Sequence, residues 1–208
     1  MGRFDSVDIR VRNPESGSVL LATRVPSDGD GVLLAGQIHE GAESLDARIE
    51  LPKNPELERV LADALGPLRD ELQRGEVRHG DLHFRDQDGS RVDGFGLVFE
   101  RVSIGEFDSE HWMGVYTTPR GRFEFSAASD PEPIIIITGI AAAVCLIQKG
   151  IFALRSGCEA RLHETALECM RTGGSPRYRV HANFGLSFSP FKIGCDPTCE
   201  FLGCDLRK

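Results

Sequence analysis

The stretch PEPIIIITGIAAAVCLIQKGIFALRSG, Pro131–Gly157, is the most apolar part of this 208-residue chain. Within it, Ile134–Ile147 contains Thr138 as its single polar side chain. A helix of that length covers about 21 Å, which is less than the hydrocarbon core of a bilayer, about 30 Å. Extension to Leu154 gives about 32 Å and so permits a membrane span. Lys149 would then have to reach the headgroups near one end.

Two structures are compatible with this composition. Gly139 and Ala143 form a small-xxx-small pair, which suits close helix packing in lipid or in protein. A non-membrane alternative is a strand over IIIIT, followed by a buried helix from Ile140. We therefore expect Ile134–Leu154 either to enter a membrane or to be buried in the protein or at an oligomer interface. The expected contact residues are Ile134, Ile135, Ile136, Ile137, Gly139, Ala143, Ile147 and Lys149.

The first 130 residues read as an antiparallel β domain with one helix. Short alternating runs bounded by turn clusters predict strands. A capped apolar pattern from Asn54 to Leu72 predicts a helix packed across the sheet. The predicted strands are 6–12, 18–25, 31–38, 45–51, 76–84, 94–102, 112–118 and 121–127.

Charge and cysteine content both change near residue 130. The chain has a net charge of −8, yet residues 133–208 hold 9 Lys/Arg against 6 Asp/Glu. All six cysteines follow residue 144. We predict an α+β protein in three parts: an acidic α+β domain (1–130), an apolar helical segment (131–157) and a small Cys-rich α+β module (158–208).

Cysteine spacing in the third part favours disulfides. Cys158 and Cys169 share one face of an amphipathic helix that Gly173-Gly174 ends, so they can fasten the C-terminal tail. Cys145 either joins this network, which argues against a position in mid-bilayer, or one thiol stays free. A metal site with His163 or His181 is the alternative. The candidates for disulfides are Cys158, Cys169, Cys195, Cys199 and Cys204.

A second weak metal pattern lies in HGDLHF. His79, Asp81 and His83 alternate, so a strand would place them on one face. We prefer the interpretation that this is simply the solvent face of a strand. An enzyme, the third functional possibility, would need a metal here or at the cysteines. We expect no cofactor.

The predicted function is that of a non-enzymatic, membrane-associated protein. Its acidic domain would bind a partner or join an assembly, and Ile134–Leu154 would anchor the protein to a membrane or insert into one. The strongest form of this prediction is a toxin-like effector. The alternative is a soluble structural or assembly subunit. Its apolar helix would be buried within the protein or at the interface of a homo-oligomer. Net negative charge argues against nucleic acid as a partner. The start, MGRFDSVDIR, lacks a signal-peptide pattern, so no compartment is predicted.

Overall fold

The computed structural model describes residues 9–26, 31–51, 55, 59, 79–82, 96–104, 109–128, 133–188 and 191–206. Within these ranges, the side chains of 79–82, 96–104, 109–112, 128, 133–137, 183–188 and 191–195 are not described.

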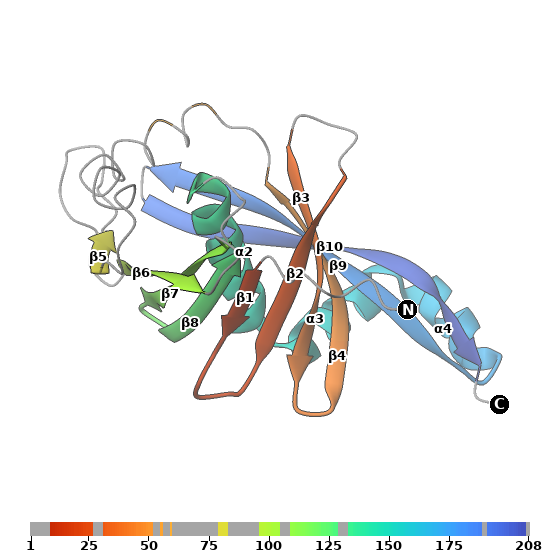
Figure 1. Ribbon diagram of the computed structural model, residues 1–208. Helices are drawn as coiled ribbons and strands as arrows, with labels where there is room; N and C mark the ends of the chain where they lie inside the picture. The colour runs from red at the N-terminus through yellow and green to blue at the C-terminus, as the bar shows by residue number, and fades with distance from the viewer. Residues whose placement is uncertain are drawn as a thin grey trace.

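A single ten-stranded sheet organises the described part of the chain (Figure 1). Its spatial order is β10-β9-β4-β3-β2-β1-β8-β7-β6-β5. Neighbouring strands run antiparallel, except for β4 and β9, which are parallel. The strands are β1 (Ile9–Arg12), β2 (Val19–Val25), β3 (Val32–Glu40), β4 (Glu43–Leu51), β5 (His79–Leu82), β6 (Gly96–Ile104), β7 (Ser109–Thr118), β8 (Gly121–Ala128), β9 (Gly174–Phe188) and β10 (Phe191–Leu206).

Alternation of apolar and polar residues explains which face of the sheet is buried. In β1, Ile9 and Val11 are buried while Arg10 and Arg12 are exposed. The same period of two recurs in β8, where Phe123 and Phe125 point inward. Because successive side chains of a strand point to opposite faces, these residues give one apolar inner face and one polar outer face.

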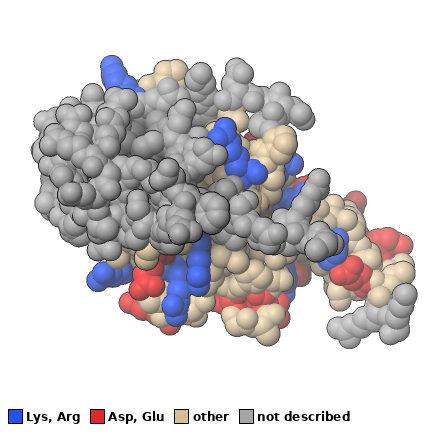
Figure 2. Space-filling view, viewed as in Figure 1, with Lys and Arg blue, Asp and Glu red and all other residues tan. Residues whose placement is uncertain are grey.

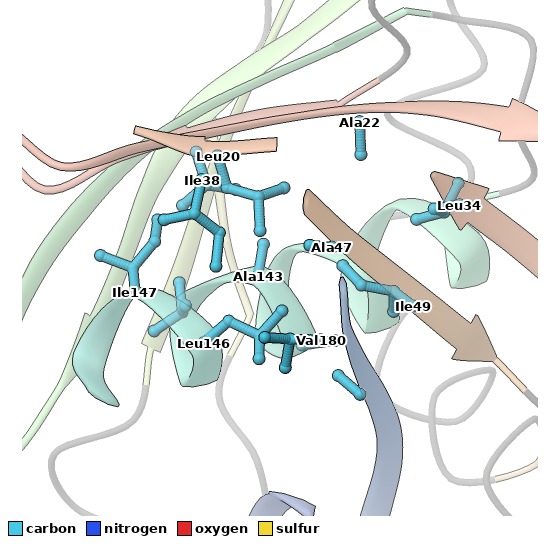
Figure 3. Close-up of a cluster of buried hydrophobic side chains, with 14 of the residues drawn as sticks. Leu20, Ala22, Leu34, Ile38, Ala47, Ile49, Ala143, Leu146, Ile147 and Val180 are labelled. Carbon is cyan, nitrogen blue, oxygen red and sulfur yellow. The ribbon is translucent and has the colours of Figure 1, made fainter. Parts of the chain in front are cut away.

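The inner face is covered by α2 (Pro133–Lys149), which lies across strands from both halves of the sheet. Thr138–Ile147 is almost entirely buried, and Ala143 and Leu146 are among its fully buried residues, as Figure 3 shows. Burial of each large aliphatic side chain contributes about 1.5–3 kcal/mol, an upper estimate because unfolded chains are not fully extended. The apolar helix is thus the centre of the protein's hydrophobic core.

Glycine allows this helix to approach the sheet closely. A Cβ at Gly139 would stand 2.5 Å from Ile9 Cδ1 and 3.1 Å from Leu34 Cδ1. The small-xxx-small pair therefore serves helix-on-sheet packing here.

At its end, α2 turns sharply into α3 (Ile151–Arg161), with an angle of 82° between the helices. Gly150 makes the corner with φ 75°, a conformation that favours glycine. The Ile151 backbone N–H, which has no partner within α3, donates to Glu40 Oε2 at 3.0 Å. Leu162 then separates α3 from α4 (His163–Arg171).

These elements confirm the predicted α+β class and the predicted strands that fall within the described residues. The strand proposed over IIIIT is wrong: Pro133–Lys149 is one continuous helix, and its described apolar residues from Ile140 to Ile147 pack on the inner face of the sheet. The single amphipathic helix predicted after Gly157 is instead α3, which already includes Gly157, followed by α4. Of the helix predicted over Asn54–Leu72, only Pro55 and Arg59 are described, and both are helical.

Candidate functional site

The β9–β10 hairpin continues beyond the sheet and forms a projection. Its pairing with β4 covers only Arg179–Asn183 of β9. Gly174–Tyr178 and the facing Phe201–Leu206 therefore extend past the sheet, with α4 packed alongside. We call these two strand segments and α4 the arm. In Figure 1 the arm lies at the right, beside the C-terminus.

Two disulfides fasten the hairpin to the helices, as the cysteine spacing predicted. Cys158 of α3 is bonded to Cys199 near the base of the arm, and Cys169 of α4 to Cys204 near its end. Cys145 is disulfide-bonded as well, and no cysteine with a described side chain is free. The side chain of Cys195 lies outside the described residues. A metal site built from Cys158, Cys169, Cys199 or Cys204 is thereby excluded.

The end of the arm is built around the second disulfide. A Cβ at Gly174 would stand 2.2 Å from Cys204 Sγ, so only glycine fits between the strand and the disulfide. Thr172 Oγ1 donates to the carbonyl of Cys169 at 2.7 Å and closes the last turn of α4. Next to this disulfide, Met170 and Leu206 are 51% and 63% exposed. We call Met170, Leu206 and the Cys169–Cys204 disulfide the arm tip.

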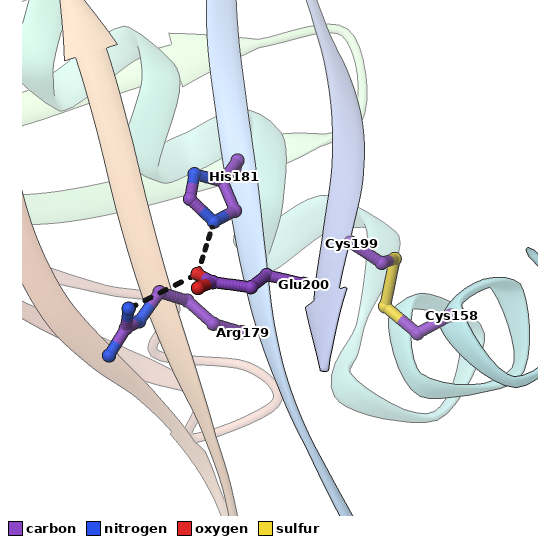
Figure 4. A network of polar contacts seen from close by, with 5 residues as sticks. All are labelled: Cys158, Arg179, His181, Cys199 and Glu200. Carbon is purple, nitrogen blue, oxygen red and sulfur yellow. Dashed lines mark hydrogen bonds and ion pairs between the residues drawn. A yellow bond between two sulfur atoms is a disulfide. The ribbon is translucent and has the colours of Figure 1, made fainter. Parts of the chain in front are cut away.

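On the outer face of the hairpin, one carboxylate joins an arginine and a histidine (Figure 4). His181 Nε2 donates to Glu200 Oε2 at 2.9 Å, and Arg179 Nη1 donates to the same oxygen at 3.2 Å. The hydrogen bond from His181, together with the nearby Arg179, lowers the pKa of Glu200 below its ordinary value. The Cys158–Cys199 disulfide lies on the opposite face of the strands.

At the base of the arm, Tyr178 is buried. The side chain is 4% exposed, its ring lies edge-on to Phe201 at 6.3 Å, and its hydroxyl has no hydrogen-bond partner within the described part of the chain. Burial, reinforced by the negative charge of Glu159, raises the pKa of Tyr178, so the phenol stays protonated.

Of the residues predicted to contact a membrane or an interface, some are buried in the core and one is exposed. Gly139, Ala143 and Ile147 pack into the core, whereas Lys149 is exposed at the end of α2. Ile134–Ile137 are helical, with side chains that are not described. Among the described residues, no single helix has both the length and the apolar composition to cross a membrane. Thr138–Lys149 and Ile151–Arg161 meet that criterion only as a bent pair.

The weak metal pattern is not tested by the structure. His79 and Asp81 lie on β5, whose side chains are not described, and His83 is outside the described residues. In the part of the chain with described side chains, no three His, Cys, Asp or Glu residues come together to hold a metal. His163 and His181 are the two histidines suggested as ligands of a metal site with the cysteines. Of these, His181 forms a hydrogen bond with Glu200.

The arm tip and the outer-face cluster were not anticipated from the sequence. The alternation RYRVHA at 177–182 does signal a strand with Arg179 and His181 on one face. Nothing in the sequence indicates that Glu200 meets them, because this contact depends on the hairpin register. No family model, curated protein or solved structure matches the chain. The candidate site is therefore defined by its geometry.

Proposed function

We propose that this chain is a non-enzymatic protein-binding module and that it contacts its partner through the arm tip. The observation that carries the proposal is the exposure of Met170 on α4 and of Leu206 on β10, the two elements that the Cys169–Cys204 disulfide joins at the end of the arm. Large apolar side chains exposed on a projecting element are typical of interaction sites. Methionine, which is flexible and polarisable, is frequent in such contacts.

Rigidity of the arm supports this role. The two disulfides join residues 41 and 35 positions apart and hold the hairpin against α3 and α4. A surface that is already ordered loses less conformational entropy on binding, so more of the contact energy appears as affinity. Disulfides also support action in an oxidising compartment, because reducing compartments keep thiols free.

Acidic and basic side chains are interspersed on the visible face of the arm, which is the composition of an interface rim (Figure 2). Arg177 of β9 pairs with Asp205, the residue before Leu206, at 3.7 Å. Exposed ion pairs of this kind contribute little to stability. Polar groups around an apolar centre are, however, the usual anatomy of a protein–protein contact.

Burial of the apolar helix favours this assembly role over a membrane anchor. Membrane insertion of Ile134–Leu154 remains the alternative proposal, and the bent α2–α3 pair is the observation in its favour. Insertion would require α2 to leave the sheet and expose an apolar inner face.

Site-specific photo-crosslinking in cells of the source organism tests the proposal. A photoreactive amino acid at position 170 or 206 is expected to give one discrete crosslinked protein. Its yield should fall when the wild-type protein, without the photoreactive amino acid, is co-expressed in excess. The control position is Thr117, which is exposed on β7, far from the arm in the sheet order.

Because both side chains are exposed, we expect the paired variant Met170→Glu/Leu206→Glu to keep the fold and to compete at least ten times less well than the wild type. Equal competition by this variant would overturn the proposal. So would a crosslinked product that is the same from position 117 as from the tip.

A further inference from the structure

A small pocket lies between the end of α2, α3 and the β9–β10 hairpin, on the inner side of the hairpin base. Its volume is about 210 Å³. This is the space of about seven water molecules, and smaller than most sites for drug-sized ligands. Its lining residues are Lys149, Ala153, Leu154, Gly157, Arg161, Val180, Pro197 and Cys199.

Two cations and no acidic side chain line this pocket. Arg161 Nη1 donates to the carbonyl of Pro197 at 2.5 Å, which holds the guanidinium beside β10 and leaves its other donors available. Lys149 comes from the last turn of α2. Among the described residues, neither side chain has a carboxylate partner. The pocket is thus electrostatically complementary to an anion.

The remaining walls are apolar. Leu154 and Val180 are buried in the core, and Cys199 contributes from its disulfide with Cys158. A ligand with an anionic head and a short hydrocarbon chain could place the head between the cations and the chain against these walls. A strongly hydrated anion such as phosphate would leave the apolar walls unused.

We propose that this pocket binds a carboxylate attached to a short apolar group. The chemistry is the same whether the carboxylate belongs to a free short-chain acid or to the C-terminus of a protein ending in an aliphatic residue. This site is separate from the arm tip, so the proposal does not depend on the one made for Met170 and Leu206.

The variants for the test follow from the lining. Lys149→Gln and Arg161→Gln each remove one cation. Gly157→Leu fills the pocket, and it should not disturb the fold because a Cβ at Gly157 meets nothing within 4 Å. The matched control is Arg171→Gln on α4, an exposed arginine that is not part of the lining.

Binding is measured by titration of the folded wild-type protein, followed by amide chemical shifts or by calorimetry. The probes are hexanoate, its neutral analogue hexanamide, inorganic phosphate, and the peptide acetyl-Gly-Leu as free acid and as amide. We expect saturable binding of a carboxylate probe, at least ten times tighter than that of its neutral amide. Each Gln variant at Lys149 or Arg161 should weaken binding about tenfold, Gly157→Leu should abolish it, and Arg171→Gln should leave it unchanged.

The two carboxylate sources are separated by the probes. If only hexanoate binds, the natural ligand is a free short-chain acid. If acetyl-Gly-Leu as free acid binds more tightly than hexanoate, the natural ligand is the C-terminus of a protein. The proposal is overturned if neither carboxylate saturates the protein at tens of millimolar, if the neutral amides or phosphate bind as well, or if the Lys149 and Arg161 variants bind like the wild type.

Discussion

At the scale of single residues, an unfavourable feature of the described part of the chain is the buried hydroxyl of Tyr178. A buried hydroxyl without a partner loses its hydrogen bonds to water and gains none, which costs about 1–3 kcal/mol. We expect Tyr178→Phe to increase the free energy of unfolding by about 1 kcal/mol, because the ring still packs against Phe201. Chemical denaturation of the two proteins gives this difference. A loss of stability in the variant would mean that the hydroxyl has a hydrogen-bond partner after all.

Glu200 provides a pH-dependent contribution to stability. Its pKa is lowered in the folded protein, first by the hydrogen bond from His181 and then by Arg179. The folded state therefore favours the ionised carboxylate. This contribution is fully present above the ordinary glutamate pKa, 4.5, and is lost as the pH falls through the lowered value.

We accordingly expect Glu200→Gln to be less stable than the wild type at pH 6–7, with a difference that shrinks below the ordinary value of 4.5 and disappears as the pH falls through the lowered pKa of Glu200. The difference should also shrink at high salt, because the side chain is 46% exposed and the pair is screened. Thermal denaturation from pH 3 to pH 7 measures it. Glu15→Gln, in an exposed turn without an ion pair among the described residues, serves as the control. A difference that is constant with pH would contradict the assignment.

At the scale of elements, α2 decides the packing of the whole inner face. Ala143 is fully buried between the helix and the sheet, so a larger side chain has no space there. We expect Ala143→Leu to lower the free energy of unfolding by about 1–3 kcal/mol through overpacking. Denaturation in aqueous buffer tests this value.

The matched control is Ala160→Leu on the exposed side of α3, where the same change should alter stability by less than about 0.5 kcal/mol. If Ala143→Leu also had no effect, α2 would have to pack elsewhere than against the sheet.

At the scale of the whole molecule, the disulfides join segments that are distant in sequence. Each closes a loop large enough to stabilise the fold by about 2–4 kcal/mol.

We expect Cys158→Ser/Cys199→Ser to lower the stability of the whole protein, because that bond ties the core helix α3 to β10. We expect Cys169→Ser/Cys204→Ser to release mainly the arm. Hydrogen exchange distinguishes the two: the second variant should lose protection in 163–178 and 201–206 only. Uniform loss of protection in both variants would contradict this division.

Burial of α2 also predicts how the intact chain fractionates. Because its apolar residues already contact the sheet, we expect the expressed protein to remain in the supernatant without detergent and after a carbonate wash of membranes. Retention in the membrane pellet until detergent is added would instead support insertion of Ile134–Leu154 and the membrane-associated alternative.

Local patterns determined much of this protein by themselves. Alternation in segments such as Ile9–Arg12 and Gly121–Ala128 specifies strands, because side chains on a strand must divide between core and water. The cysteine pattern indicated correctly that Cys158 and Cys169 fasten the tail, although the two lie on separate helices, α3 and α4, and not on one. The α+β class follows from these patterns together.

Only the tertiary structure decided what covers the apolar helix and which residues meet on the arm. An apolar run has the same composition in lipid as in a protein core, so Ile134–Leu154 alone does not distinguish the two. The parallel pairing of β9 with β4 joins the C-terminal hairpin to the first strands, and the hairpin register brings Glu200 to His181. The Cys169–Cys204 disulfide likewise fastens α4, which carries Met170, to β10, which carries Leu206. Such contacts join residues far apart along the chain, and their free energy depends on the packing of the whole molecule.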